Sequence, residues 1–205
     1  MSWIKCNLKS ILRIAASFLA ASIIMMIMWN HKITPPGTMS GIKPVYQSDY
    51  KATVTTIGGQ NKSVWTSGCG AVVVAMAAGY YIGEDISCED LFRWACDNGF
   101  YSGNGLGHEA LSEMLKPYGL VGRWINNDDT RAVKLALQTG RPVVAHVGPG
   151  TFTKNGHYIL LIDYKDGQAR VNDPGSRDRS GRYFDLDLIR NELRRENSFM
   201  IIERI

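Results

Sequence analysis

A thiol, an imidazole and a carboxylate stand in distinctive contexts along this 205-residue chain. Cys69 lies between two glycines, His157 opens an apolar run and Asp173 precedes a proline. A thiolate can act as a nucleophile when an imidazole takes its proton and a carboxylate holds that imidazole in one tautomer. The three residues, in this order, could therefore carry out nucleophilic catalysis through a thiol.

Cys69 directly precedes an apolar stretch at residues 71–81. Its length favours a helix, although the valines at 72–74 favour a strand. We predict a helix that starts at the glycines around Cys69 and ends near Gly79. A cysteine at a helix N-terminus has its thiolate stabilised by the helix dipole and by free backbone N–H groups. The alternative is a buried structural cysteine between two turn glycines.

The histidine and the aspartate belong to a predicted hairpin. Residues 157–164 are typical of a strand, 165–168 of a turn and 169–172 of the returning strand. This hairpin would bring His157 and Asp173 to neighbouring strand ends, where the carboxylate can accept a hydrogen bond from the imidazole. The alternatives are a structural or solvated histidine and a plain Asp-Pro turn.

Hydrophobic periodicity also predicts elements elsewhere in the chain. We expect helices at 88–98, 107–118, 128–140 and 186–195, strands at 141–147 and 199–203, and a short strand or turn that begins at 183–184. Helices dominate the first part and antiparallel strands the second. This order predicts an α+β domain.

The N-terminal region has the pattern of a membrane-targeting segment. Residues 14–29 carry no charge and follow Lys5, Lys9 and Arg13. With the apolar residues before it, the stretch reaches the roughly 17–25 residues that span a bilayer. Residues 23–29 offer no Ala-x-Ala cleavage site, which favours an uncleaved signal-anchor over a cleaved secretory signal. The positive-inside rule then leaves the N-terminus in the cytoplasm and the following domain outside.

Composition and proline content define the domain boundaries. The chain is 45% hydrophobic and 20% charged, which is typical of a folded protein. The proline-rich run at 34–38 cannot propagate a helix or a sheet. We therefore predict a cytoplasmic stub and signal-anchor segment at 1–33, a linker at 34–43 and one domain at 44–205.

Charge and cysteine usage argue against several classes of protein. A formal net charge of +4 and the lack of an interleaved basic and aromatic stripe indicate no nucleic-acid partner. Cys88 and Cys96 could pair in an oxidising exterior, but on one helix they would lie more than two turns apart, which is beyond disulfide reach unless the helix breaks. The sequence has no cysteine or histidine spacing typical of a metal site, so we expect no metal and no cofactor. We also expect a monomeric protein.

Four ordered blocks resemble one protein family. Residues 67–76, 140–144, 152–159 and 171–174 together look like the papain-like cysteine peptidases related to bacteriocin-leader (double-glycine) peptidases. The resemblance implies an α+β papain-like fold, in which an N-terminal helical half with the nucleophile helix packs on an antiparallel sheet. It also implies roles for the three residues above: nucleophile for Cys69, general base and acid for His157, and orienter of the imidazole for Asp173.

The chain departs from the family pattern at two points. The family commonly has Gly-Cys-Gly-Pro-Thr, whereas this chain has Ala71 and Val72 after the second glycine; we interpret this change as tolerated. The family also has an upstream glutamine that donates to the oxyanion. Gln47, in a segment that resembles the family's, is the first candidate, and Gln60 remains an alternative.

Further residues in or beside the blocks are expected to bind substrate. These are Gly68, Gly70, Trp65, Phe152 and Gly156, of which Trp65 and Phe152 would line its groove. The sequence thus predicts a membrane-anchored, extracytoplasmic cysteine peptidase that acts on a peptide or protein and meets the membrane through its N-terminal helix. The alternatives are secretion after signal cleavage, transamidation or cell-wall amide cleavage on the same fold, and a catalytically inactive binding module.

Overall fold

The computed structural model describes residues 39–205, apart from residues 102 and 104. A six-stranded antiparallel sheet has the strand order β3-β8-β4-β5-β6-β7. Its strands are β3 (Leu120–Ile125), β4 (Val143–Val147), β5 (His157–Lys165), β6 (Gln168–Asn172), β7 (Tyr183–Asp185) and β8 (Phe199–Arg204). A separate hairpin pairs β1 (Thr55–Ile57) with β2 (Gln60–Lys62).

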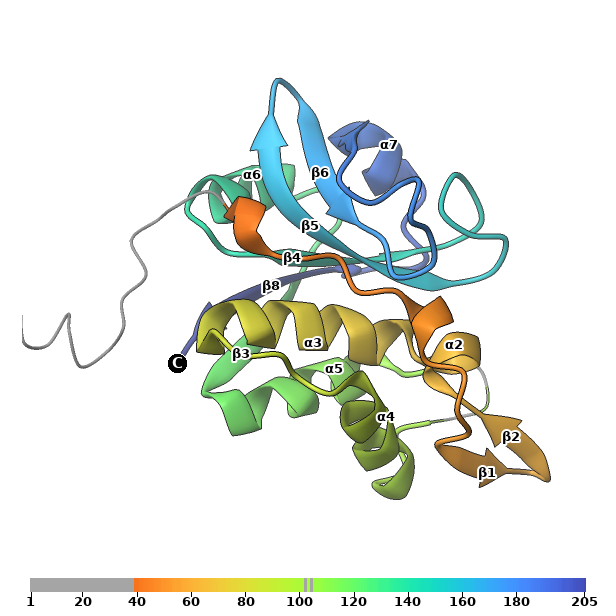
Figure 1. Cartoon of the computed structure of the whole chain (residues 1–205). Coiled ribbons are helices and arrows are strands. Elements are labelled where there is room, and N and C mark those ends of the chain that lie inside the picture. Colours follow the sequence, from red (N-terminus) through yellow and green to blue (C-terminus); the bar gives the residue numbers. More distant parts are fainter. Residues whose placement is uncertain (1–38, 102, 104) are drawn as a thin grey trace, which may run out of the picture. The chain divides into compact units, whose positions relative to one another are not determined.

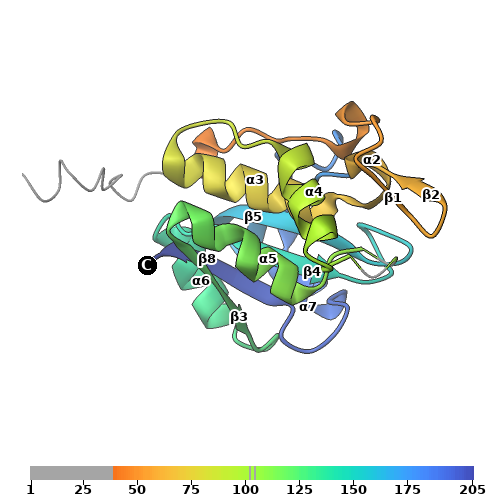
Figure 2. The same cartoon turned by 90° about the horizontal axis from the view of Figure 1, so that it is seen from below.

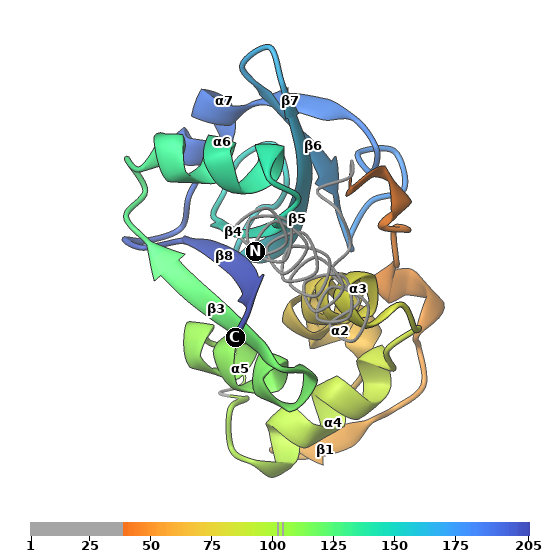
Figure 3. The ribbon, with the colours of Figure 1, turned by 90° about the vertical axis from the view of Figure 1, so that its left-hand side faces the viewer.

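Helices cover the sheet on both sides. They are α2 (Val64–Ser67), α3 (Cys69–Ile82), α4 (Cys88–Asp97), α5 (His108–Leu115), α6 (Thr130–Gln138) and α7 (Leu186–Asn191). In Figure 1, α3, α4 and α5 lie below the sheet, whereas α6 and α7 lie above it. Figure 2 shows α3, α4 and α5 packed beside one another, and Figure 3 shows α6 across the sheet from α3. This arrangement confirms the predicted α+β class.

Helix α3 is the centre of the helical half. It packs against α4, α5 and β5, and every residue from Gly70 to Ala78 is buried. An apolar stretch without a polar face is therefore expected here, because the helix is enclosed on all sides. The three valines, which favour a strand locally, are accommodated because their side chains are fully buried.

The end of α3 differs from the prediction. The helix runs past Gly79 to Ile82 and is capped by Gly83, whose φ of 81° is left-handed. Gly79 lies inside the helix, where a Cβ would come within 2.8 Å of the Glu84 carbonyl oxygen. Gly79 is thus required by the close approach of the returning chain, and the prediction that it ends the helix is wrong.

The sequence prediction also missed several elements. β3 was not predicted, because Gly122 and Arg123 interrupt its apolar pattern; a Cβ at Gly122 would meet the Met200 side chain on β8. The predicted helix at 186–195 stops at Asn191. Leu193 forms a bridge with β4, which takes the chain out of helical geometry. Strands therefore also occur between helices, and the separation into a helical part and a strand part is incomplete.

Residues before 44 pack on the domain. Met39 and Ile42 are buried in the core, and the amide of Asn172 donates to the Ile42 carbonyl oxygen at 2.9 Å. The described part of the predicted linker, 39–43, therefore belongs to the folded domain. The predicted membrane segment lies outside the described residues, and no helix within the described part combines the length and apolarity needed to cross a bilayer.

Gly68 sets how closely α2 approaches the start of α3. Its φ is −100°, so the position does not need glycine for backbone conformation. A Cβ there would, however, lie 2.6 Å from the Cα of Val64, which is backbone and cannot move aside cheaply.

We expect Gly68→Ala to lower the free energy of unfolding by about 1–3 kcal/mol, because the added methyl group must push α2 away from α3. Gly41→Ala is the matched control, since a Cβ at Gly41 meets nothing within 4 Å. Urea unfolding of both variants measures the difference. Equal stability of the two variants would contradict this account of Gly68.

Candidate active site

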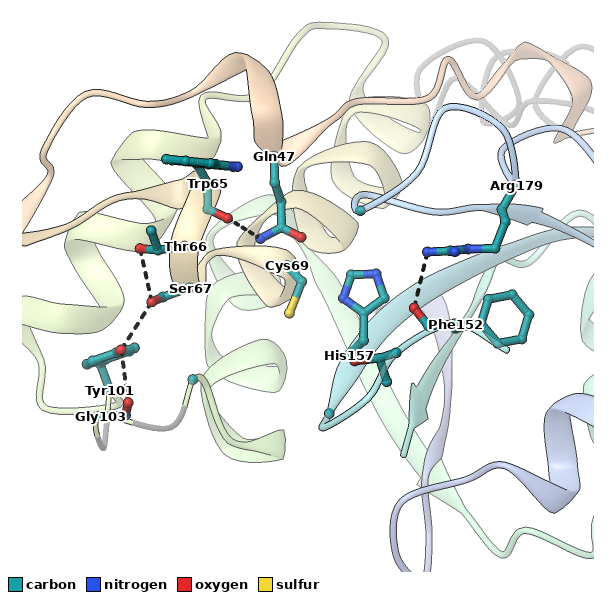
Figure 4. Close-up of a pocket in the computed structure, with 14 residues that line it drawn as sticks. Gln47, Trp65, Thr66, Ser67, Cys69, Tyr101, Gly103, Phe152, His157 and Arg179 are labelled. Carbon is teal, nitrogen blue, oxygen red and sulfur yellow. Dashed lines mark hydrogen bonds between the residues drawn. The ribbon is translucent and has the colours of Figure 1, made fainter. Parts of the chain in front are cut away.

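A cavity of about 400 Å³ lies between the helical half and the sheet. Cys69, the first residue of α3, contributes to one wall and His157, the first residue of β5, to the opposite wall. Figure 4 shows the side chains of Cys69 and His157 beside each other, with Gln47 above them. The structure therefore brings together residues that are far apart in the sequence.

Several groups around Cys69 favour its thiolate. Burial by itself would raise the pKa of the thiol. The hydrogen bond and charge of His157, together with the backbone N–H groups of Tyr158 and Gly70, outweigh burial and hold the pKa of Cys69 below its usual value. The position at the N-terminus of a helix acts in the same direction.

His157 is held between Cys69 and Asp173. Its Nε2 lies 2.7 Å from Oδ1 of Asp173, which leaves Nδ1 as the ring nitrogen available to the thiol. Burial lowers the pKa of His157, but hydrogen bonds to Asp173 and Cys69 raise it to about 9. The raised pKa of His157 and the lowered pKa of Cys69 both favour a pair of thiolate and protonated imidazole.

Asp173 lies directly after β6 and is fully buried. Its Oδ1 also accepts from the Gly175 N–H at 2.7 Å, and its Oδ2 accepts from Nε of Arg179 at 2.6 Å. Burial would raise the pKa of this carboxyl, but His157 and Arg179 together hold it below its usual value. Asp173 is thus an ion with a partner on each oxygen.

The two candidate glutamines lie in different places. Gln47 lines the cavity, and its side-chain amide donates to the carbonyl oxygens of Val64 at 2.9 Å and Trp65 at 3.3 Å. Gln60 is exposed on β2, where its side chain accepts from Lys62. Of the two, the structure brings only Gln47 to the cysteine.

The predicted substrate-binding residues divide into two groups. Trp65, Phe152 and Gly156 line the cavity, whereas Gly68 and Gly70 do not. A Cβ at Gly70 would meet Leu111 at 2.9 Å, and Gly68 packs on α2. These two glycines allow close packing around the nucleophile helix and do not line the cavity, and a role for them in substrate binding stays a prediction.

Sequence reasoning missed other residues of the cavity. The hydroxyl of Tyr101 donates to Ser67 Oγ at 3.1 Å, which closes the helical side. Gly175 also lines the cavity, and a Cβ there would lie 3.2 Å from Nε2 of His157. Arg179 lies on the sheet side (Figure 4). No motif marks these residues, although Arg179 belongs to an arginine-rich loop.

Two further histidines contact each other and the ring of Tyr158. Nε2 of His108 and Nδ1 of His146 are 3.0 Å apart, and His108 stacks on Trp124 with ring centroids 3.5 Å apart. Burial lowers the pKa of His108 to about 4 and that of His146 to about 3. Both rings are therefore uncharged at neutral pH and serve the packing of α5 against the sheet.

Solved structures with a similar fold are peptidase domains. The peptidase domain of Streptococcus ComA, described as a bi-functional ABC transporter involved in a quorum-sensing pathway, has a TM-score of 0.53 at 20% identity over 68% of this chain and 93% of that one. A putative C39-like peptidase from Bacillus anthracis has a TM-score of 0.54 at 15% identity over 80% of this chain and 96% of that one. At these identities the likeness concerns the fold.

The sequence itself matches a family. No curated protein matches the chain, but the sequence model of the Peptidase_C39 like family matches residues 40–199. This range includes Gln47, Cys69, His157 and Asp173. It also covers most of the chain, and with the fold it confirms the resemblance inferred from the four sequence blocks. The chain belongs to the Peptidase_C39 like family and contains a domain with the papain-like fold of these cysteine peptidases.

Proposed function

We propose that this domain is an active cysteine peptidase that cleaves a peptide or amide bond with Cys69, His157 and Asp173. One observation carries the proposal. The thiol faces an imidazole that is itself hydrogen bonded to a buried carboxylate, and thiol and imidazole both border a cavity. A structural cysteine has no need of an ionised partner at the wall of a cavity.

The reaction follows from the charges of the site. The Cys69 thiolate attacks the substrate carbonyl carbon, and the carbonyl oxygen becomes an oxyanion. Protonated His157 then gives its proton to the leaving amine as the carbon–nitrogen bond breaks. The now neutral His157 takes a proton from a water molecule as the water oxygen attacks the thioester carbon. The carbon–sulfur bond then breaks, the acid is released, and Cys69 leaves as the thiolate beside the protonated imidazole. Asp173 remains ionised and orients the ring throughout.

Gln47 and the start of α3 supply donors for the oxyanion. The backbone N–H of Cys69 stands at the first helical position, where N–H groups lack partners within the helix. The Gln47 amide has two hydrogens, which point to Val64 and Trp65. The contact to Trp65 is the longer, at 3.3 Å, so it is the one that an oxyanion would replace.

We also propose that the domain acts outside the cytoplasm from a membrane anchor. The support is the uncharged segment at 14–29 that follows three basic residues. N-terminal sequencing of the membrane fraction tests this. Recovery of Met1 or Ser2 is the expected result, whereas a soluble form that starts after residue 29 would indicate signal cleavage and secretion.

The activated thiol should be measurable directly. We expect a thiol-directed epoxide inhibitor to label Cys69 at neutral pH, and Cys69→Ala to abolish both labelling and peptide cleavage. Cys96→Ala is the control, because burial raises the pKa of Cys96. Mass spectrometry of the labelled peptides and of the products of a peptide library measures both effects.

A folded protein whose Cys69 stays unlabelled would contradict the proposal. An amide product in place of a free acid would indicate transamidation.

The pH dependence follows from the two shifted groups. Because the pKa of Cys69 is lowered, the thiolate and hence kcat/KM should persist below the range of an ordinary thiol. Because the pKa of His157 is raised to about 9, the proton for the leaving amine is lost only near that pH, where kcat/KM should fall. A pH profile of kcat/KM measures both limits. An alkaline limit near 6.5 would contradict the ion pair.

The two glutamines provide a matched pair for the oxyanion site. We expect Gln47→Ala to lower kcat by about 10²–10³, because one donor to the oxyanion is removed. Gln60→Ala should leave kcat unchanged. Steady-state kinetics measures kcat, and thermal unfolding of both variants checks the fold. An equal kcat for the two variants would exclude Gln47 from the reaction.

A further inference from the structure

A second cation contacts the buried carboxylate of the site. Nε of Arg179 lies 2.6 Å from Oδ2 of Asp173, on the oxygen that His157 does not use. Asp173 has no exposed surface, and the side chain of Arg179 is 30% exposed. An ion pair with one fully buried partner is screened little by water. Arg179 is thus the second of two cations that compensate the charge of Asp173.

Arg179 also holds a wall of the cavity. Its Nη2 donates to the carbonyl oxygen of Phe152 at 3.1 Å, and the guanidinium lies 5.9 Å from the centroid of the Phe152 ring. Figure 4 shows both side chains on the same side of the cavity as His157. The forked guanidinium therefore connects the carboxylate to the segment before β5, which a single point charge could not do.

The loop that carries Arg179 is fixed to Asp173 by further contacts. The backbone N–H of Asp173 donates to Oγ of Ser180 at 2.9 Å, and this hydroxyl also lies 3.1 Å from the Asp173 carbonyl oxygen. The N–H of Arg179 donates to Oγ of Ser176 at 3.2 Å. Because these contacts hold the loop on both sides of Arg179, the guanidinium has a defined place relative to the carboxylate.

We propose that Arg179 is a positioning residue of the proposed active site: it holds the Asp173 carboxylate ionised and in place, and so determines how strongly Asp173 holds the ring of His157. This inference rests on the proposed function. Charges alternate along the row from Cys69 through His157 and Asp173 to Arg179. Arg179 draws the carboxylate toward itself and opposes the positive charge on the imidazole. The ring then remains acidic enough to give its proton to the leaving amine.

The titration of His157 provides a test that does not need turnover. Cys69→Ala removes the thiol and any peptidase activity but leaves His157, Asp173 and Arg179 in place. His146, on the neighbouring strand β4, also interacts electrostatically with His157. Its pKa is lowered to about 3, so it stays neutral while His157 titrates. Histidine side-chain NMR in this background reports the pKa of His157, assigned by comparison with His157→Gln.

Arg179→Gln and Arg179→Lys separate charge from shape. Glutamine retains hydrogen-bond donors but no charge, so we expect the pKa of His157 to rise by about one unit, because the carboxylate then acts on the imidazole alone. Lysine retains the charge, so the pKa should stay close to that of the Cys69→Ala parent. Arg177→Gln is the control, since Arg177 lies on the same loop as Arg179 but pairs with the exposed Asp49 instead of Asp173.

The outcomes are distinct. An unchanged His157 pKa in the folded Arg179→Gln protein overturns the proposal. If that variant does not fold, the lysine variant decides, because a pKa that rises despite the retained charge also overturns the proposal. A rise confined to Arg179→Gln supports it. If the native protein proves inactive on peptides while this shift is observed, the proposed function fails and the assignment of Arg179 to Asp173 and His157 stands.

Discussion

The paired burial of Asp173 and His157 is the constraint on which the rest of the site depends. A fully buried carboxylate is tolerated only when charges and hydrogen bonds replace the water it has lost. His157 provides one partner from the start of β5, while Gly175 and Arg179 provide others from the loop after β6. The hairpin and this loop must therefore be correctly placed together before Asp173 can exist as an ion.

The helical half contacts His157 and the end of β6 through the start of α3 and through Gln47. Helix α3 is buried along most of its length and packs on β5, so its first residue, Cys69, is brought against His157. The backbone N–H of Gln47 donates to the carbonyl oxygen of Pro174 at 2.9 Å, and its side chain holds α2. Gln47 thus joins the end of β6 to the segment before the nucleophile, which keeps the two walls of the cavity together.

Much of the fold was predictable because local sequence and burial agree. The apolar stretch after Cys69 is too long for a strand and forms α3, and the turn at 165–168 joins two β-rich runs that form β5 and β6. Two of the failures have a common cause. Gly79 and Gly122 look like interruptions in the sequence, but each allows a distant part of the chain to approach closely. Contacts of this kind leave no local pattern.

The three residues proposed for the chemistry were identifiable from the sequence alone: a thiol before an apolar helix, and an imidazole and a carboxylate at the ends of one hairpin. Each of these residues stands in a short sequence pattern that can be recognised without knowledge of the fold. Only the tertiary structure distinguished Gln47 from Gln60 and brought Arg179 to Asp173. The physical reason is that charge compensation of a buried ion and completion of a cavity are decided by distance in space, on which sequence spacing has little bearing.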